Sequence, residues 1–550
     1  MTAPSGSRPD ALFLNGRFHT LDPARPLAGA LAASGGRIVA LGEPDELAAA
    51  FPGYTRIDLG GRTVLPGFVD SHIHLAAYGI ALRRIDLAGA GSLREAVSAV
   101  RAAAREHPEA WILGRGWDKN VWPEDRFPSA TDLDPVSPAN PVALSSKDGH
   151  LLWVNSAAMR LAGVTPQTPD PPGGEITRDE RGLPTGILKE ESAKALVGKV
   201  IPPAGARAVE RGIRDAGAIL HRVGITGVHS FVGTERYEGE TVFGVLQDLA
   251  ARGDLPLRVC ATLPLGALEA AASGLRTGSG DAWLRTGPLK VFADGTLGSQ
   301  TAGMLEPYDG QPHNTGIAIH GREELAAIVR RAVGAGCWCA IHAIGDRANR
   351  WVLDAYQANA DASRRLGARH RIEHVQLIHP DDLPRLAALG VTASMQPIHA
   401  TSDRDIADRY WGRRSRTAYA WRSLLRAGTV LAFGSDAPVE TPDPWQGIYA
   451  AVTRRRPADQ RTAWYPEEAL TIEEAVRAYT VGAAWASGEE GVKGILSPGR
   501  LADFIVLDRD VMFEPPEALL ETTVLVTIIG GRPVYAAGPL SGMASGGLPK

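Results

Sequence analysis

The sequence is poor in cysteine, in long apolar runs and in excess charge, and each shortage excludes a class of protein. Its 550 residues include only three cysteines, too few for a disulfide scaffold, so we expect a reducing, cytoplasmic environment. No apolar run is long enough to span a bilayer, and the first residues lack the charged-then-apolar pattern of a signal peptide. A formal charge of −4 gives no reason to expect nucleic acid or a membrane as a partner.

The length of the chain predicts two or three domains, because a single core rarely grows this large. Short apolar stretches separated by turns fill residues 1–66 and again residues 491–550. Asn15–Gly16 between two such stretches predicts a β-hairpin. We expect the two chain ends to pair into one small β-sandwich. The competing interpretation is two unrelated additions to the ends of the chain.

Residues 67–490 alternate between predicted strands and helices. The pattern favours a closed (β/α)₈ TIM barrel of the α/β class over an open doubly wound sheet, since no glycine-rich fingerprint follows the first strand. The predicted strands are Val64–Ile73, Ile225–Ser230, Leu257–Ala261, Leu289–Ala293, Trp338–His342, His370–Val375, Val391–Gln396 and Thr429–Gly434. The gap between the first two is far longer than a normal connection, so residues 85–205 are expected to form an inserted α/β subdomain.

Five polar residues end four of these predicted strands. His72 and His74 are two apart on one strand, so both imidazoles point the same way. His342, His374 and Asp436 each end another apolar run, where a barrel places its chemistry. Taken singly, each is as well explained as a polar residue of the core. Together they predict a metal site, because a shared ion removes the cost of burying them.

With these motifs the chain resembles the amidohydrolase superfamily, in particular its branch of YtcJ-like proteins and N-substituted formamide deformylases. The resemblance covers nearly the whole chain. It rests on the segments VLPGFVDSHIHL, GRGWD, DGHLLWVNSAA, LKVFADGTLGSQTA, HAIGD, RIEHVQ, FGSDAPVE and GRLADFIVLD.

The resemblance implies roles for the matching residues. His72, His74 and Asp436 would bind the more buried zinc ion, and His342 and His374 a second one. Lys290 occupies the position at which related enzymes carry a carboxylated lysine that bridges two ions, and an uncarboxylated ammonium there would be repelled by two dications. The competing interpretation pairs Lys290 with Asp294, on the same strand face, beside a single ion.

The implied reaction is hydrolysis of a non-peptide C–N bond, such as that of an N-substituted formamide, by a metal-activated hydroxide. Asp436 would act as general base and then as general acid toward the leaving nitrogen. A cyclic amide, a carbamate or an ester remains open as the substrate. A deaminase is disfavoured, since Asp346 lies at a different spacing from the glutamate that deaminases usually carry, and an inactive scaffold would have lost ligands.

Several further residues are candidates for substrate contact. His150 could hydrogen-bond a substrate carbonyl or a developing oxyanion, or it could hold the insertion together. The remaining candidates are Trp117, Asp118, Asp294, Gln396 and His399, each of which could instead serve only the local fold. The expected partner is a small-molecule substrate, and the resemblance suggests a homodimer.

Overall fold

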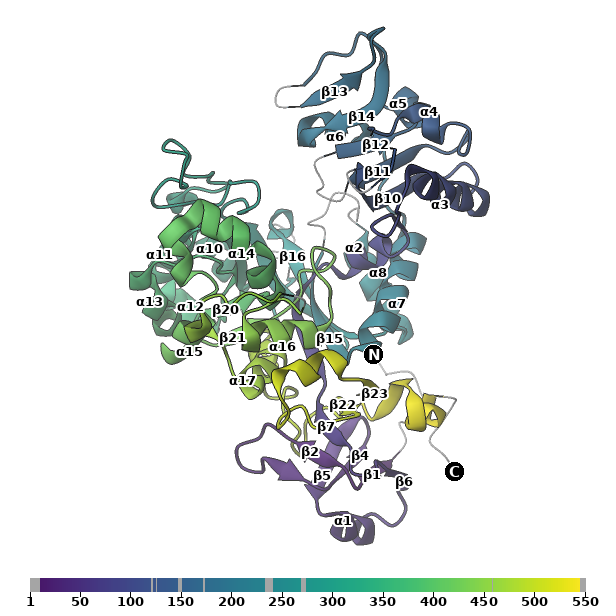
Figure 1. Cartoon of the computed structure of the whole chain (residues 1–550). Coiled ribbons are helices and arrows are strands. Elements are labelled where there is room, and N and C mark those ends of the chain that lie inside the picture. Colours follow the sequence, from purple (N-terminus) through teal and green to yellow (C-terminus); the bar gives the residue numbers. More distant parts are fainter. Residues whose placement is uncertain are drawn as a thin grey trace. The chain divides into compact units, whose positions relative to one another are not determined.

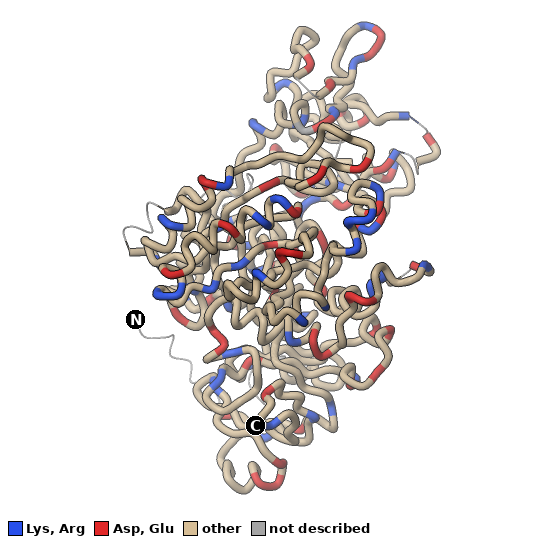
Figure 2. Tube along the Cα trace, turned by 90° about the vertical axis from the view of Figure 1, so that its left-hand side faces the viewer, with Lys and Arg blue, Asp and Glu red and all other residues tan. Residues whose placement is uncertain are grey.

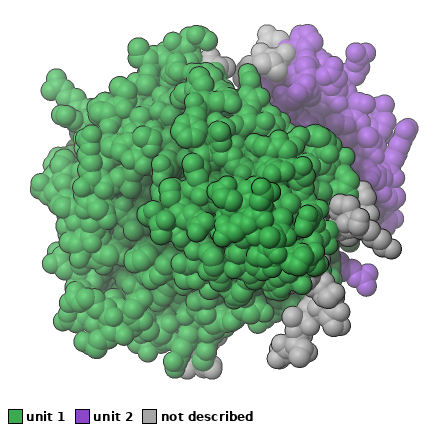
Figure 3. Space-filling view, turned by 90° about the horizontal axis from the view of Figure 1, so that it is seen from below, with its two compact units in different colours: residues 1–79, 209–550 green, residues 80–208 purple. Residues whose placement is uncertain are grey.

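The computed structural model describes residues 10–119, 122–124, 126–146, 151–171, 174–232, 241–268, 274–457 and 459–544. The chain divides into two compact units, residues 1–79 with 209–550, and residues 80–208 (Figure 3). Among the described residues, none of the helices combines the length and apolarity needed to cross a bilayer. Basic and acidic residues are interspersed along the trace (Figure 2), in keeping with the small net charge.

Strands from both ends of the chain build a β-sandwich within the first unit (Figure 1). Phe13, Phe18 and Phe504 meet in its core, with the Phe13 and Phe504 ring centroids 4.9 Å apart. One sheet has the order β5 (Arg37–Gly42), β4 (Ala30–Ser34), β1 (Ala11–Leu14) and β6 (Thr55–Asp58). The other has the order β24 (Arg532–Ala536), β23 (Val524–Ile529), β22 (Phe504–Leu507), β7 (Thr63–Pro66), β2 (Arg17–His19) and β3 (Leu27–Ala28).

The hairpin predicted at Asn15–Gly16 is wrong. Strands β1 and β2 flank this turn but belong to different sheets, with β1 paired to β4 and β6 and β2 paired to β3 and β7. Asn15 does adopt the left-handed conformation of a tight turn, with φ 53°. The turn therefore carries the chain from one sheet of the sandwich to the other.

The predicted strand Val64–Ile73 is also wrong as a single element. It divides at Gly67 into β7, which pairs with β22 in the sandwich, and β8 (Phe68–Ile73), which pairs with β15 in the barrel. A side chain at Gly67 would come within 2.3 Å of Thr226. Glycine at position 67 leaves room for Thr226 at the point where the chain passes from the sandwich to the barrel.

The other seven predicted strands join β8 in an eight-stranded parallel barrel sheet, and the predicted fold class is confirmed. Its strands run in chain order: β8, β15 (Ile225–Phe231), β16 (Arg258–Pro264), β17 (Leu284–Phe292), β18 (Cys339–Ala343), β19 (Arg371–His374), β20 (Thr392–Met395) and β21 (Leu431–Phe433). Helices on the outside connect them (Figure 1), among them α7 (Ala206–Arg222), α8 (Val242–Arg252), α10 (Arg322–Gly334), α11 (Asp346–Ala358), α13 (Leu383–Leu389) and α15 (Trp421–Arg426).

Hydrogen bonds at the carboxyl ends of β8 and β21 join the first and last strands. The Asp436 amide donates to the His72 carbonyl (2.7 Å), and the His74 amide donates to the Ala437 carbonyl (3.0 Å). The buried Asp70 carboxylate accepts from the Ser435 amide (3.0 Å) and hydroxyl (2.6 Å). These contacts hold the His72–His74 segment against the segment that carries Asp436.

The second unit is an α/β domain with its own core. Its sheet has the order β13 (Glu175–Arg178), β14 (Pro184–Lys189), β12 (Leu151–Val154), β11 (Val142–Ser146), β10 (Ile112–Trp117) and β9 (Ile85–Asp86). Its helices include α3 (Leu93–Glu106), α5 (Ser156–Leu161) and α6 (Glu190–Gly198). Trp117, Trp122 and Trp153 pack together there, with ring centroids 6.0 to 6.3 Å apart.

Candidate metal centre

The structure brings together the five residues that end the barrel strands. The Nε2 atoms of His72 and His74 lie 3.4 and 3.3 Å from Oδ1 of Asp436. The His374 ring lies 4.9 Å from that of His72 and 4.6 Å from that of His342, measured between centroids. Parallel strands end at one rim of the barrel, so residues more than 300 positions apart in the sequence become neighbours.

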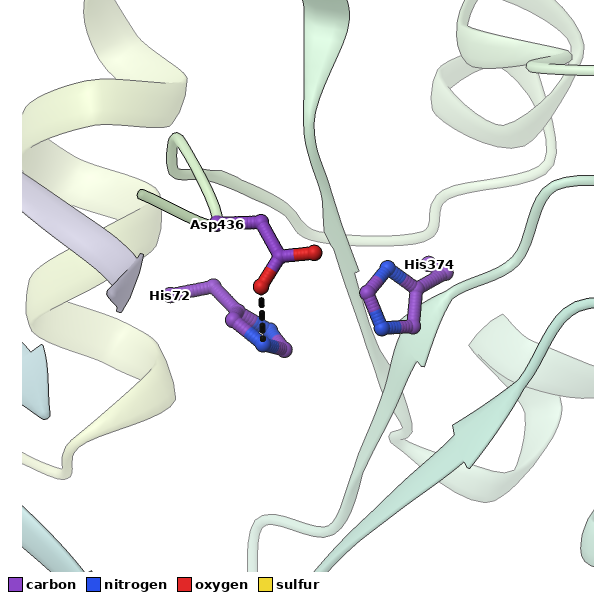
Figure 4. Close-up of side chains that lie close together, drawn as sticks. All are labelled: His72, His374 and Asp436. Atoms are coloured by element: carbon purple, nitrogen blue, oxygen red, sulfur yellow. Dashed lines mark ion pairs between the residues drawn. The ribbon is translucent and has the colours of Figure 1, made fainter. Parts of the chain in front are cut away.

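The donor set at this rim fits a divalent metal ion. His72, His374 and Asp436 each offer one ligand atom, and these atoms all lie within 4.8 Å of one another (Figure 4). Two imidazoles and a carboxylate are ligands that zinc and similar ions accept. Burial lowers the pKa of His342, to about 3, and of His374. Both rings are therefore neutral at pH 7, the form in which an imidazole binds metal.

Two of the converging residues have an unusual backbone. His374 has φ 78° and Asp436 has φ 59°, in the left-handed region that residues other than glycine seldom adopt. Such conformations cost on the order of 1–3 kcal/mol and persist where the surroundings impose them, often at functional sites. Here they turn both side chains toward the same point beyond the ends of their strands.

Three imidazoles of the site are each oriented by a second partner. His72 Nδ1 lies 2.7 Å from Oε2 of Glu373, His374 Nδ1 lies 2.8 Å from Oε1 of Gln396, and His342 Nε2 lies 3.0 Å from the Gly295 carbonyl. Sequence reasoning missed Glu373. The signal was present, because the buried strand sequence Arg371-Ile-Glu373 holds two charged residues on one face.

Lys290 faces the same cavity as the histidines. Its Nζ atom lies 4.3 Å from the ring centroid of Phe231 and 4.7 Å from that of Phe292. The side chain is buried and points into the barrel, as strand alternation predicts. Carboxylation of Lys290 stays a prediction.

A cavity of about 360 Å³ opens beside the cluster. His399 lies on its wall, with Nε2 3.2 Å from Oδ2 of Asp436 and Nδ1 3.9 Å from Oε1 of Glu440. The lining includes His72, His74, Lys290, Phe292, Leu297, His342, Ile344, His374, Gln376, His399, Asp403, Asp436, Val439 and Glu440. The space suits a small substrate held against Asp436 and the imidazoles.

Asp294 and Gln396, which the sequence offered for substrate contact, are engaged within the protein. The Asp294 carboxylate has no exposed surface and accepts from the amides of Gly303 (2.8 Å), Ile344 (3.0 Å) and Gly345 (2.9 Å). It ties the loop after β17 to the loop after β18. Gln396 is buried against His374. Substrate contact by either residue stays a prediction.

The remaining candidates belong to the second unit. Trp117 is buried in that unit's core, where its indole N–H donates to the Leu144 carbonyl at 2.8 Å. Asp118 is half-buried beside it. His150 lies outside the described residues. The packing of Trp117 gives it a role in the stability of the insertion, and substrate contact by these three residues stays a prediction.

Comparison with known proteins identifies the family of the chain. A family model described as "Amidohydrolase family" matches residues 55–535. The Bacillus subtilis protein YtcJ, named as an amidohydrolase, is 33% identical over 88% of this chain and 91% of its own. The N-substituted formamide deformylase of Arthrobacter pascens is 31% identical over 95% of this chain and 97% of its own.

A solved structure gives the same result for the fold. A metal-dependent hydrolase from Pyrococcus furiosus superposes with a TM-score of 0.76 and is 30% identical. The match covers 92% of this chain and 100% of the other. Family and fold thus agree across both ends of the chain, the barrel and the insertion.

Proposed function

Because the chain belongs to the amidohydrolase family and is a metal-dependent hydrolase of carbon–nitrogen bonds, we propose that its substrate is a small N-substituted amide, with a formamide as the first candidate. The similarity to the formamide deformylase extends over nearly the whole of both chains. The cavity volume of about 360 Å³ favours a substrate with a small acyl group. We propose zinc as the ion, because imidazole and carboxylate suit it.

A divalent ion at this site would polarise the amide carbonyl and lower the pKa of a bound water toward neutrality. Asp436 is the residue we assign to proton transfer. Its Oδ1 lies beside His72 and His74, and its Oδ2 accepts from His399 at 3.2 Å. It can take a proton from the attacking water and return it to the leaving nitrogen, which cannot depart as an anion.

The observation that carries this proposal is the convergence at the wall of a single cavity of the residues that end the barrel strands: His72, His74, His342, His374 and Asp436. A deaminase is less well supported. Asp346, the acid that follows His342, accepts from the amides of Leu305 (2.8 Å) and Arg347 (2.9 Å) and lines a different cavity. The same machinery can attack a cyclic amide, a carbamate or an ester, so these are the alternative substrates.

The test is turnover of a substrate panel by the zinc-loaded protein. We expect release of amine from N-substituted formamides, and Asp436→Asn should reduce that turnover about 10²- to 10⁴-fold, the usual contribution of a general acid–base group. Asp443→Asn is the matched control, because the Asp443 side chain caps α16 (Pro444–Thr453) and accepts from Gln446, and asparagine caps a helix equally well. Turnover of cyclic amides alone would replace the formamide assignment, and near-native turnover by Asp436→Asn would remove its catalytic role.

A further inference from the structure

We propose that Glu373, held in place by Arg371, is a positioning residue that makes His72 a stronger imidazole donor to the metal site than His374 or His342. The inference rests on the proposed function, because it concerns the ion that this function requires. It ranks histidines of the site by their strength as metal ligands. It also gives a role to Glu373, which the sequence motifs did not reveal.

The contact between Glu373 and His72 sets the direction of the imidazole. A carboxylate accepts hydrogen bonds, so His72 must donate from Nδ1 across the 2.7 Å to Glu373 Oε2. The lone pair is therefore on Nε2, the atom that lies 3.4 Å from Asp436. Both side chains are almost wholly buried, at 1% and 0% exposure. The imidazole is thus held in the tautomer and orientation that metal binding needs.

Arg371 holds the carboxylate itself. Its Nε donates to Oε1 of Glu373 at 2.6 Å, and an Nη donates to Oε2 at 2.9 Å. The same Nη2 atom also lies 2.6 Å from the Ser71 carbonyl and 2.7 Å from the Ser394 hydroxyl, and Nη1 donates to Nδ1 of His229 at 2.8 Å. Arg371 thereby anchors Glu373 to three other barrel strands, β8, β15 and β20, which leaves little freedom for His72 to turn.

Such a wholly buried ion pair is weak evidence for stability. Removing two charges from water costs several kcal/mol per ion, and an apolar pair of similar volume is often as stable. A pair whose carboxylate ends on the outer nitrogen of a metal-ligating imidazole has a different explanation. It orients that ligand and raises its basicity, the usual role of a carboxylate behind a metal-binding histidine.

His374 and His342 hydrogen-bond neutral oxygens, and the Asp294 carboxylate lies farther from His342, with Oδ1 3.5 Å from Nε2. His374 donates from Nδ1 to the amide oxygen of Gln396, whose orientation is supported by its own weak contact with the Ser394 carbonyl. His342 donates from Nε2 to the Gly295 carbonyl. A neutral oxygen polarises an imidazole less than a carboxylate does. His72 should therefore be the stronger ligand, and His374 and His342 the weaker ones.

The experiment measures the zinc dissociation constant of the full-length protein by competition with a chromophoric chelator. Glu373→Gln keeps the size of the side chain and removes its charge, and we expect zinc affinity to fall about 10- to 100-fold. The reciprocal variant Gln396→Glu places a carboxylate behind His374 and should raise affinity about tenfold. Unchanged affinity in Glu373→Gln, or weaker binding in Gln396→Glu, would overturn the proposal.

The control is Glu474→Gln, which breaks a similar arginine–carboxylate fork with Arg422 (two contacts of 2.6 Å) away from the cavity. It should lower the thermal midpoint of the metal-free protein and leave zinc affinity unchanged. If Glu373→Gln fails to fold beside an unneutralised Arg371, the gain expected of Gln396→Glu decides alone. Failure of the wild-type protein to bind zinc would contradict the proposed function instead.

Discussion

Strand β19 has a buried histidine at each end, and the two histidines have different surroundings and different roles. His370, just before the strand, stacks on Tyr356 with ring centroids 4.5 Å apart. Its Nδ1 accepts from the Cys339 amide (3.0 Å), and its Nε2 donates to the Ser363 hydroxyl (2.9 Å). His374, at the other end, has a strained backbone and faces the metal cavity.

Burial does not distinguish these residues, since their exposures are 4% and 5%. What differs is the end of the barrel and the number of ring nitrogens already used. Both nitrogens of His370 have partners within the protein, whereas His374 uses Nδ1 on Gln396 and directs Nε2 toward the cavity. In this fold, polar residues at the carboxyl ends of strands serve chemistry, and those at the amino ends serve stability.

The largest difference between the two ends of β19 is expected from His374→Asn. Loss of an imidazole ligand should remove stoichiometric zinc and reduce turnover by at least about 100-fold. Stability of the metal-free protein should stay level or rise by up to about 1 kcal/mol, because asparagine tolerates a φ of 78° better than histidine does.

Zinc content and urea unfolding of the same preparations would check both halves of this prediction. His370→Asn is the counterpart at the other end of the strand, and it should bind zinc normally while losing stability. If His370→Asn lost zinc and His374→Asn kept it, the assignment of the two strand ends would be reversed.

A smaller effect is expected from pH. Burial lowers the pKa of His370 to about 4, from 6.5, and protonation would set a new N–H of Nδ1 against the Cys339 amide. The unfolded chain therefore binds a proton that the folded chain refuses, so this contribution to stability is complete above pH 6.5. It is lost as pH falls toward 4, by about 3 kcal/mol in total.

Urea unfolding of the metal-free protein across pH 6.5 to 4.5 measures this loss. The slope of unfolding free energy against pH should be shallower in His370→Asn than in wild type, by up to about 1.4 kcal/mol per pH unit. Metal-free protein is used because zinc binding is itself pH-dependent and would add to the slope. Parallel curves for the two proteins would show that His370 is protonated without penalty.

Most of the barrel and of the candidate metal site could be predicted, because both depend on local patterns in the sequence. Apolar runs located the barrel strands, and the polar residue that ends each run then identified the site, since parallel topology alone makes those ends converge. Strand length and strand-end chemistry are local properties.

The errors and omissions depend on contacts between distant segments. Asn15–Gly16 does form a turn, but no local signal tells that its flanking strands join different sheets. The division of Val64–Ile73 at Gly67 depends on Thr226, far along the chain, which leaves no room for a side chain at position 67. The hydrogen bond between His72 and Glu373 likewise depends on the folded barrel, because the two residues lie on its first and sixth strands. Such pairings are properties of the tertiary structure.

The smallest effect that tests the comparison is expected from Ser363→Ala. The Ser363 hydroxyl accepts the hydrogen bond from His370 Nε2 within a buried contact. Its removal should lower the free energy of unfolding by about 1–2 kcal/mol, the range for a buried donor left without its partner. Zinc content and turnover should be unchanged, because His370 lies at the amino end of β19. Urea unfolding and a zinc assay on one preparation decide this, and any loss of zinc would mean that the two ends of the strand are coupled.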